Sequence, residues 1–320
     1  MHSLTPWHWQ QRFTPWKNPG IYHVTLAVTP REPILGALQI PTMNGTPNPE
    51  EATVVRSDLG RAVVECMALL EHFHPEMHLI KYCVMPDHLH FIVQVLKPMD
   101  ISIKMALRGF QTGCRKEARR LGLDGAAIFS EPPYIRPLSR HGQLRIMFRY
   151  VEDNPRRLAV KQLFPGSFRT TRDITIGEDH FDAVGNLLLL NASQYGTVHV
   201  RHELVDMAEV GNDGPLRAYM NGCILAARKG TILISPFVSR YEKAILAELV
   251  KENLPVICLR ENGFPPYYKP SGLIFDACAQ GRVLLLAPQT YDKGVGRIRR
   301  AQCVAMNEEA VRIAQTLGTE

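Results

Sequence analysis

This sequence of 320 residues lacks long apolar runs, and its tryptophan-bearing start has no signal-peptide core. A membrane-spanning helix needs roughly 18 or more consecutive apolar residues, and no stretch approaches that length. Both absences predict a cytoplasmic protein without a membrane partner.

Paired cysteine motifs and glycine-rich phosphate loops are also missing. The seven cysteines are odd in number and include no Cys-x-x-Cys, which excludes a zinc finger and predicts reduced thiols. Neither Gly-x-Gly-x-x-Gly nor a Gly-Lys-Ser/Thr loop occurs, so NAD binding and ATP hydrolysis are not expected. No internal repeat is found.

The net positive charge of the chain lies in its first half. Residues 1–165 hold 20 Lys and Arg against 14 Asp and Glu, whereas residues 166–320 hold 17 of each. The length and the 45% hydrophobic content suit two globular domains. The net charge of +6 therefore points to an anionic partner, such as nucleic acid in the bacterial nucleoid, for the first half.

The most informative segment is Met85-Pro86-Asp87-His88-Leu89-His90-Phe91-Ile92-Val93. On a β-strand alternate side chains share a face, so His88 and His90 would stand about 7 Å apart while Leu89 and Phe91 enter the core. With residues 81–84 before the Pro-Asp turn, the segment predicts a hairpin carrying two metal ligands. Taken alone, it suits two structural or surface histidines equally well. A second pair, His72 and His74, precedes Pro75 at a helix end and predicts a solvated surface.

A helix is predicted about sixty residues further on. Leu144, Met147, Phe148 and Val151 follow the i, i+3, i+4, i+7 rule of an amphipathic helix. Tyr150 and Asn154 lie one turn apart beside that apolar stripe, and Pro155 interrupts or kinks the helix at Asn154. By itself this segment favours a tyrosine at the core edge and an asparagine closing a helix.

Together, His88-Leu89-His90 and Tyr150-x-x-x-Asn154-Pro155 resemble the single-tyrosine HUH transposases, including the REP-associated tyrosine transposases. Tyr22 to Thr25 as a first strand and Ser57 to Phe73 as a first helix support the resemblance, which covers about residues 18–165. It implies that His88, His90 and Asn154 bind a divalent metal, Mg²⁺ or Mn²⁺, and that Tyr150 attacks DNA.

The residue types suit that chemistry. A metal polarises the anionic phosphodiester, and neutral imidazole and amide ligands leave the full charge of the ion in place. A tyrosine oxygen forms a 5′-phosphotyrosine that preserves the phosphodiester for rejoining. The sequence identifies no separate general base, so we expect metal-assisted deprotonation of Tyr150. A single-stranded or hairpin DNA partner is expected because a closed duplex would hinder entry of the scissile phosphate into a small site.

Tyr134 is the main rival nucleophile. It lies in residues 128–136, which match the strand that precedes the tyrosine helix in this family. Tyr150 is preferred because a rigid helix with Asn154 one turn on positions an oxygen better than a proline-rich strand entry. Tyr22 and His23 are expected to be structural.

A basic cluster is predicted on a helix that begins near Ile101, with Phe110 packed inward. Such a run is often only a solvated face, but next to the predicted site it becomes a candidate for phosphate contacts. The candidate DNA-binding residues are Arg108, Arg115, Lys116, Arg119 and Arg120.

The pattern changes after residue 165. Short apolar runs at residues 187–190, 231–234, 256–259 and 283–286 predict parallel strands buried on both faces. Between the second and third runs, the capping box Ser239-x-x-Glu242 opens a helix predicted over residues 241–253. This β-α-β alternation predicts a doubly wound α/β domain.

The stretch from Thr231 to Ser239, with its helix and the next strand, loosely resembles the Rossmann-like DNA-processing protein A and nucleotide-sensing relatives. Ligands of such sheets bind at the carboxyl ends of strands, and here the candidates are Ser235, Ser239, Arg260 and Asn262, with Glu261 beside them. A scaffold without a ligand fits as well. The basic loop of residues 294–300 is expected to be a solvated turn.

The sequence thus predicts an N-terminal extension (1–17), an α+β ferredoxin-like HUH domain (18–165), a linker (166–184) and an α/β Rossmann-like domain (185–320). The expected activity is metal-dependent cleavage and rejoining of single-stranded DNA. Two alternatives stay open: a domesticated, non-catalytic DNA-binding protein, and a nucleotide sensor that the first domain targets to DNA. Monomer and homodimer are both compatible with the sequence.

Overall fold

The computed structural model describes residues 17–123, 128–130, 132–266, 268–294 and 298–319. Most of the predicted N-terminal extension lies outside these residues, as do Gly296 and Arg297 of the predicted basic loop. The chain divides into two compact units, residues 1–160 and residues 161–320. No helix in the described part of the chain is long and apolar enough to cross a membrane.

The first unit is built on a four-stranded antiparallel sheet. Its strands follow the order β6-β7-β1-β8 and span Gly20–Ala27 (β1), Met77–Met85 (β6), His88–Val95 (β7) and Tyr134–Pro137 (β8). Helix α1 (Asp58–Phe73) connects β1 to β6, and α2 (Ile103–Arg120) connects β7 to β8. The predicted hairpin, first strand and first helix are therefore confirmed.

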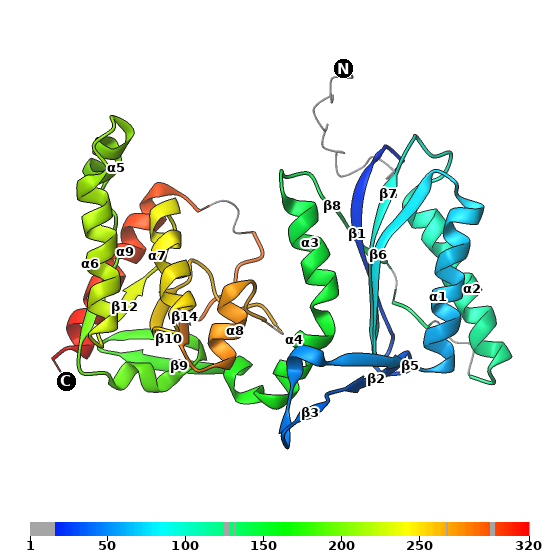
Figure 1. Ribbon diagram of the computed structural model, residues 1–320, viewed down its shortest axis with the longest axis horizontal. Helices are drawn as coiled ribbons and strands as arrows, with labels where there is room; N and C mark the ends of the chain where they lie inside the picture. The colour runs from blue at the N-terminus through cyan, green and yellow to red at the C-terminus, as the bar shows by residue number, and fades with distance from the viewer. Residues whose placement is uncertain (1–16, 124–127, 131, 267, 295–297, 320) are drawn as a thin grey trace. The chain divides into compact units, whose positions relative to one another are not determined.

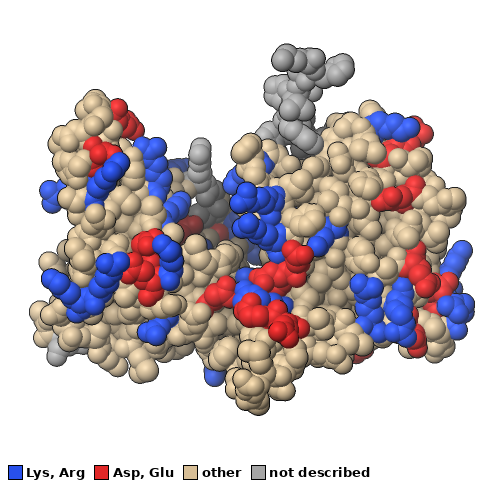
Figure 2. All heavy atoms as spheres, viewed as in Figure 1, with Lys and Arg blue, Asp and Glu red and all other residues tan. Residues whose placement is uncertain are grey.

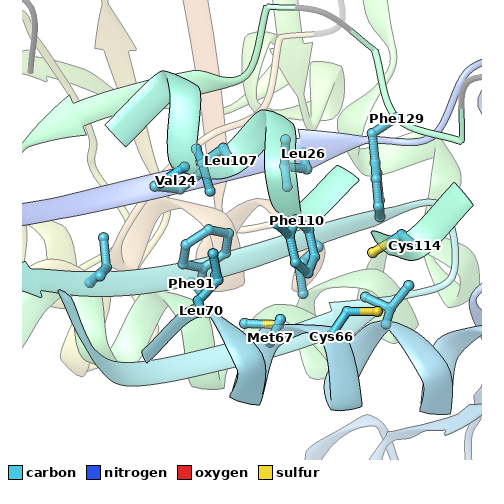
Figure 3. Close-up of a cluster of buried hydrophobic side chains, with 14 of the residues drawn as sticks. Val24, Leu26, Cys66, Met67, Leu70, Phe91, Leu107, Phe110, Cys114 and Phe129 are labelled. Atoms are coloured by element: carbon cyan, nitrogen blue, oxygen red, sulfur yellow. The ribbon is translucent and has the colours of Figure 1, made fainter. Parts of the chain in front are cut away.

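Side-chain alternation gives this sheet two different faces. Val24 and Leu26 of β1 and Leu89 and Phe91 of β7 are buried against α1 and α2, together with Phe110 of α2 (Figure 3). Helix α1 is capped by the Ser57 hydroxyl, which accepts the amide hydrogen of Gly60. As predicted, Leu89, Phe91 and Phe110 face the core.

Helix α3 (Gln143–Glu152) covers the opposite face of the sheet (Figure 1). Ile92, Leu138 and Val151 form a small buried cluster there, against which Leu144, Met147 and Phe148 pack. A turn at Asp153 separates α3 from α4 (Asn154–Leu163), so the interruption predicted before Pro155 is confirmed. The apolar stripe of α3 therefore fixes Tyr150 over the sheet face that does not bear α1 and α2.

Residues 30–51 contain short strands. β2 (Gly36–Gln39) pairs with β5 (Thr53–Arg56), and β3 (Thr42–Met43) pairs with β4 (Thr46–Pro47). A 3₁₀ turn, η1 (Pro49–Glu51), joins β4 to β5.

The second unit contains a mixed six-stranded sheet in the order β11-β12-β13-β14-β10-β9. Four strands are parallel: Tyr195–Thr197 (β11), Ile232–Ser235 (β12), Val256–Leu259 (β13) and Val283–Ala287 (β14). The helices are α5 (His202–Glu209), α6 (Gly214–Arg228), α7 (Arg240–Lys251), α8 (Leu273–Ala279) and α9 (Arg300–Leu317). Ala310 and Ile313 of α9 pack on the apolar face that Ile234, Ile257 and Leu284 form.

Three of the four apolar runs form parallel strands as predicted, but the prediction for residues 187–190 was wrong. These residues form a 3₁₀ helix, η3 (Leu187–Asn191), in which Leu188 is 73% exposed. The Asn186 side chain accepts the amide hydrogen of Leu188, and the Tyr195 hydroxyl accepts that of Ala192. Local side-chain caps therefore satisfy backbone groups that a strand would have paired.

The segment expected as a linker, residues 166–184, is largely part of the second sheet. After the 3₁₀ turn η2 (Pro165–Phe168), β9 (Thr170–Ile176) and β10 (Asp179–Gly185) form an antiparallel hairpin, and β10 pairs with β14. Because a hairpin satisfies its hydrogen bonds locally, alternating polar residues were compatible with strand formation.

The capping box predicted at the start of α7 is present. The Ser239 hydroxyl accepts the amide hydrogen of Glu242, whose carboxylate accepts that of Ser239. The same buried carboxylate also accepts from the amides of Val200 and Val238. Glu242 thus joins the loops that follow β11 and β12.

Candidate active site

The strand register places the predicted histidines among residues that the sequence did not connect to them. His90 lies opposite Cys83 on one side and Thr25 on the other, and Thr25 lies opposite Tyr134. In the neighbouring row, His23 lies between Ile92 and Arg136. Since directly opposed residues point to the same face, both rows face α3.

Four aromatic rings from three elements gather on this face. The ring centroid of Tyr150 lies 5.5 Å from that of His90 and 6.0 Å from that of His23, both in edge-to-face orientation. The His88 and His90 centroids are 4.7 Å apart. His23 stacks on His90 with 5.2 Å between centroids. The two predicted histidine ligands and the predicted nucleophile therefore lie close together, and His23 contacts both His90 and Tyr150.

The orientation of His88 is set by a carboxylate. His88 Nδ1 donates to Asp87 Oδ1 at 2.5 Å, and Arg31 donates to the other oxygen of Asp87 at 3.0 Å. The hydrogen bond with His88, aided by Arg31, holds the pKa of Asp87 well below its usual range. His88 Nε2 is then the ring nitrogen that would bind a metal, which is the usual carboxylate–histidine arrangement at metal centres.

His90 is held through the same ring atom by neutral partners. Its Nδ1 lies 2.9 Å from Thr25 Oγ1 and 3.2 Å from His23 Nε2. Burial, with a smaller effect of the Arg136 charge, lowers the pKa of His23 to about 4, so His23 is neutral near pH 7. His90 Nε2 is the remaining ring nitrogen that would bind a metal.

Tyr150 is 38% exposed, open enough to meet a substrate. Partial burial raises the pKa of its hydroxyl, and the charge of Arg157 offsets part of that effect. The rival Tyr134 is more exposed, at 59%, and shares the face of Thr25 and His90. Both tyrosines therefore lie on the site face, but Tyr150 is the one in ring contact with His90.

Asn154 is 8% exposed and its amide nitrogen is occupied. Nδ2 donates to the carbonyl oxygen of Tyr150 at 2.7 Å, one helical turn back. This bond braces the junction of α3 and α4 and leaves Oδ1 as the side-chain atom suited to a cation.

The donor set fits a divalent metal in its chemistry. Within the described residues, no group of three or more His, Cys, Asp and Glu side chains is arranged to hold a metal ion. The predicted set instead combines two imidazoles with an amide. Each imidazole uses Nδ1 in a hydrogen bond, as metal-binding histidines usually do.

The cationic residues divide between the two sheet faces. The predicted DNA-binding residues Arg108, Arg115, Lys116, Arg119 and Arg120 belong to α2, on the face opposite Tyr150. Arg120 is paired with Glu117. The face of Tyr150 has Arg136 in β8 and the exposed Arg145 and Arg149 in α3, where Figure 2 shows basic side chains gathered. These three arginines are not among the predicted DNA-binding residues, because the sequence pattern does not show which sheet face each helix covers.

In the second unit, the four residues predicted to bind a ligand lie at or after the carboxyl ends of β12 and β13, and three of them have internal roles. Ser235 is fully buried and donates to the carbonyl oxygen of Val198, and Ser239 caps α7. The Asn262 side chain binds both backbone groups of Asp292. Arg260 differs, because its buried Nε has no hydrogen-bond partner among the described residues and its guanidinium lies 5.8 Å from the Tyr268 ring centroid.

No family model matches the sequence, and neither does any curated protein. A solved structure of a REP-associated tyrosine transposase bound to a REP hairpin matches 46% of this chain and 73% of its own, with a TM-score of 0.33 and 15% identity. A putative transposase from Deinococcus radiodurans R1 matches 46% of this chain and 97% of its own, with a TM-score of 0.25 and 12% identity. About half of the chain is thus similar to transposase structures, and the roles of its residues rest on their own geometry.

Proposed function

We propose that the protein is a transposase-like enzyme that nicks single-stranded DNA and transfers the cut strand through a 5′-phosphotyrosine on Tyr150. The observation that carries the proposal is the cluster of the His88, His90 and Tyr150 rings on one sheet face. The first unit, with its β-α-β-β-α-β succession, would be a ferredoxin-like HUH domain, and the second a Rossmann-like domain.

In the first step, Tyr150 Oη attacks the phosphorus of the scissile phosphodiester. A bond forms between Oη and phosphorus while the bond to the 3′-oxygen breaks, and the departing oxygen takes a proton to become a 3′-hydroxyl. The tyrosine proton is lost to solvent. In the second step, another 3′-hydroxyl attacks the phosphotyrosine and releases Tyr150, so no external energy source is needed.

A divalent metal held by His88, His90 and Asn154 would supply positive charge that polarises the phosphate oxygens. The other contributions to catalysis would come from residues of the protein itself. Helix α3, fixed by Val151, Met147 and Phe148, positions the phenol over the histidines. Arg157 favours the tyrosinate, because its charge lowers a pKa that burial has raised.

The test is incubation of the full-length protein with labelled hairpin-flanked single strands and Mg²⁺ or Mn²⁺, followed by denaturing electrophoresis. We expect a covalent adduct that is lost in Tyr150→Phe and on chelation. Tyr134→Phe is the matched control, since it removes the other tyrosine hydroxyl on this sheet face, and its adduct should persist. An adduct that survives in Tyr150→Phe but not in Tyr134→Phe would transfer the role to Tyr134.

If DNA binds but no adduct forms with any library, the domesticated DNA-binding alternative would be favoured. The sensor alternative depends on the second unit, where the unpartnered Nε of Arg260 is the feature that suits an anionic ligand. Titration of the full-length protein with nucleotides, alongside Arg260→Gln, tests it.

A further inference from the structure

His23 is in contact with His90, a proposed metal ligand, and with Tyr150, the proposed nucleophile. It is 5% exposed in the central strand β1, and its ring lies beside that of His90, with 22° between the ring planes, and edge-on to Tyr150. The mechanism above gives it no role. Its Nε2 lies 3.2 Å from His90 Nδ1, within hydrogen-bond distance.

This contact bears on which nitrogen of His90 carries the hydrogen. In a neutral imidazole, one ring nitrogen carries a hydrogen and the other has a free lone pair. If one nitrogen donates a hydrogen bond, the other must be the nitrogen with the lone pair, and the reverse also holds. If Nδ1 carries the hydrogen, Nε2 presents a lone pair that can bind a metal. If Nδ1 accepts a hydrogen bond instead, Nε2 carries the hydrogen and cannot bind a metal.

The second partner of His90 does not settle the choice. Thr25 Oγ1 lies 2.9 Å from Nδ1, but a hydroxyl can either donate or accept. His88 differs, because its partner is the carboxylate of Asp87, which only accepts and so fixes the tautomer. The Nε2 of His23, 3.2 Å from Nδ1, is placed to be the acceptor that selects the corresponding tautomer of His90.

We propose that His23 is a positioning residue that accepts the Nδ1 hydrogen of His90 and thereby keeps His90 Nε2 available to a divalent metal. The metal half of this inference rests on the proposed function, whereas the tautomer is a property of the metal-free protein. A neutral acceptor also orients the ligand without placing a negative charge beside the phosphodiester, which a carboxylate at this position would do.

The tautomer can be measured directly. In metal-free full-length protein labelled with ¹⁵N-histidine, long-range proton–nitrogen spectra report which ring nitrogen of His90 is protonated, with His90→Gln to assign the signals. We expect the Nδ1–H form in the wild type and an increased Nε2–H fraction in His23→Phe. His23→Asn, whose side-chain oxygen can also accept, should restore the Nδ1–H form. An Nε2–H form of His90 in the wild type would overturn the inference.

Metal affinity gives the second readout, by calorimetry with Mn²⁺. Loss of a partner that orients a metal-binding histidine typically weakens binding about 10- to 100-fold, and we expect this for His23→Phe and a smaller loss for His23→Asn. His78→Phe, which removes an exposed histidine of the same sheet, should leave the affinity unchanged.

His88→Ala separates this inference from the proposed function. If His88→Ala abolishes Mn²⁺ binding but a folded His23→Phe binds as tightly as the wild type, only the role of His23 is overturned. If His88→Ala binds Mn²⁺ normally, the metal site itself is overturned, and the role of His23 toward the metal falls with it. Circular dichroism and melting curves confirm that each variant is folded.

Discussion

Removing two positive charges from α3 should weaken DNA binding in a way that removing two from α2 does not. The comparison uses Arg145→Gln/Arg149→Gln and Lys116→Gln/Arg119→Gln, all at exposed positions. Both pairs change the net charge by the same amount, so their effects on long-range attraction match. They differ in location, since α3 lies on the face of Tyr150 and α2 on the opposite face.

The magnitude follows from counterion release. Each phosphate contact to a single strand contributes about 0.7 to the slope of log K against log salt, so two lost contacts reduce the slope by about 1.4. Between 50 and 200 mM salt, the wild type should therefore lose about sevenfold more affinity than the α3 variant does. The α2 variant should keep the wild-type slope.

Fluorescence anisotropy with a labelled single strand measures both slopes, in a Tyr150→Phe background so that no strand is cut. Surface substitutions of this kind change stability by about 0.5 kcal/mol at most, so unfolding should not interfere. A reduced slope in the α2 variant together with an unchanged slope in the α3 variant would refute the reasoning. It would support the sequence-based assignment of DNA contacts to α2 instead.

Three further predictions concern the nucleophile, the metal ligands and the second unit. Because the phenolate is the reactive form and the pKa of Tyr150 is raised, adduct formation at saturating Mg²⁺ should accelerate up to pH 9. Arg157→Gln removes a charge that lowers this pKa, so it should shift the profile of rate against pH to higher pH. A plateau of the rate below pH 8 in quenched-flow measurements would contradict this expectation. Chelation and His88→Ala should each abolish the adduct but leave DNA binding in gel-shift assays intact, because we expect the arginines to make the phosphate contacts. An adduct that still forms under both changes would exclude a role for the metal. Glu242→Ala leaves three backbone amides without their acceptor, one of them buried and two partly buried, and should destabilise the second unit by about 3 kcal/mol in urea unfolding. The partly exposed Glu248→Ala should cost little.

Local patterns predicted much of the first unit. The Pro86-Asp87 turn between two apolar strands gave the β6–β7 hairpin, and the spacing of Leu144, Met147 and Val151 gave α3. In the second unit, Ser239 and Glu242 marked the start of α7 correctly. These features depend on residues close together in the chain, so the sequence contains the needed information.

Features that depend on distant residues were not predictable. His23 and Thr25 join His90 only through the pairing register of β1 and β7, which depends on how the two strands align. The wrong prediction for Leu187–Leu190 had a different cause. Four leucines have the composition of a buried strand, but side-chain caps from the neighbouring Asn186 and Tyr195 satisfy the backbone locally. The helical spacing of apolar residues predicted the apolar stripe of α3, but it did not predict the sheet face on which α3 packs.

The short strand β8 has a consequence for self-association. It forms one edge of the sheet, where an unpaired backbone would invite strand addition by a second molecule. β8 spans only Tyr134–Pro137, follows Pro132 and Pro133, and ends in a residue that has no amide hydrogen to donate. Because Pro137 cannot donate to an added strand, β8 is poorly suited to edge-to-edge pairing, and we expect any dimer of this protein to use another surface.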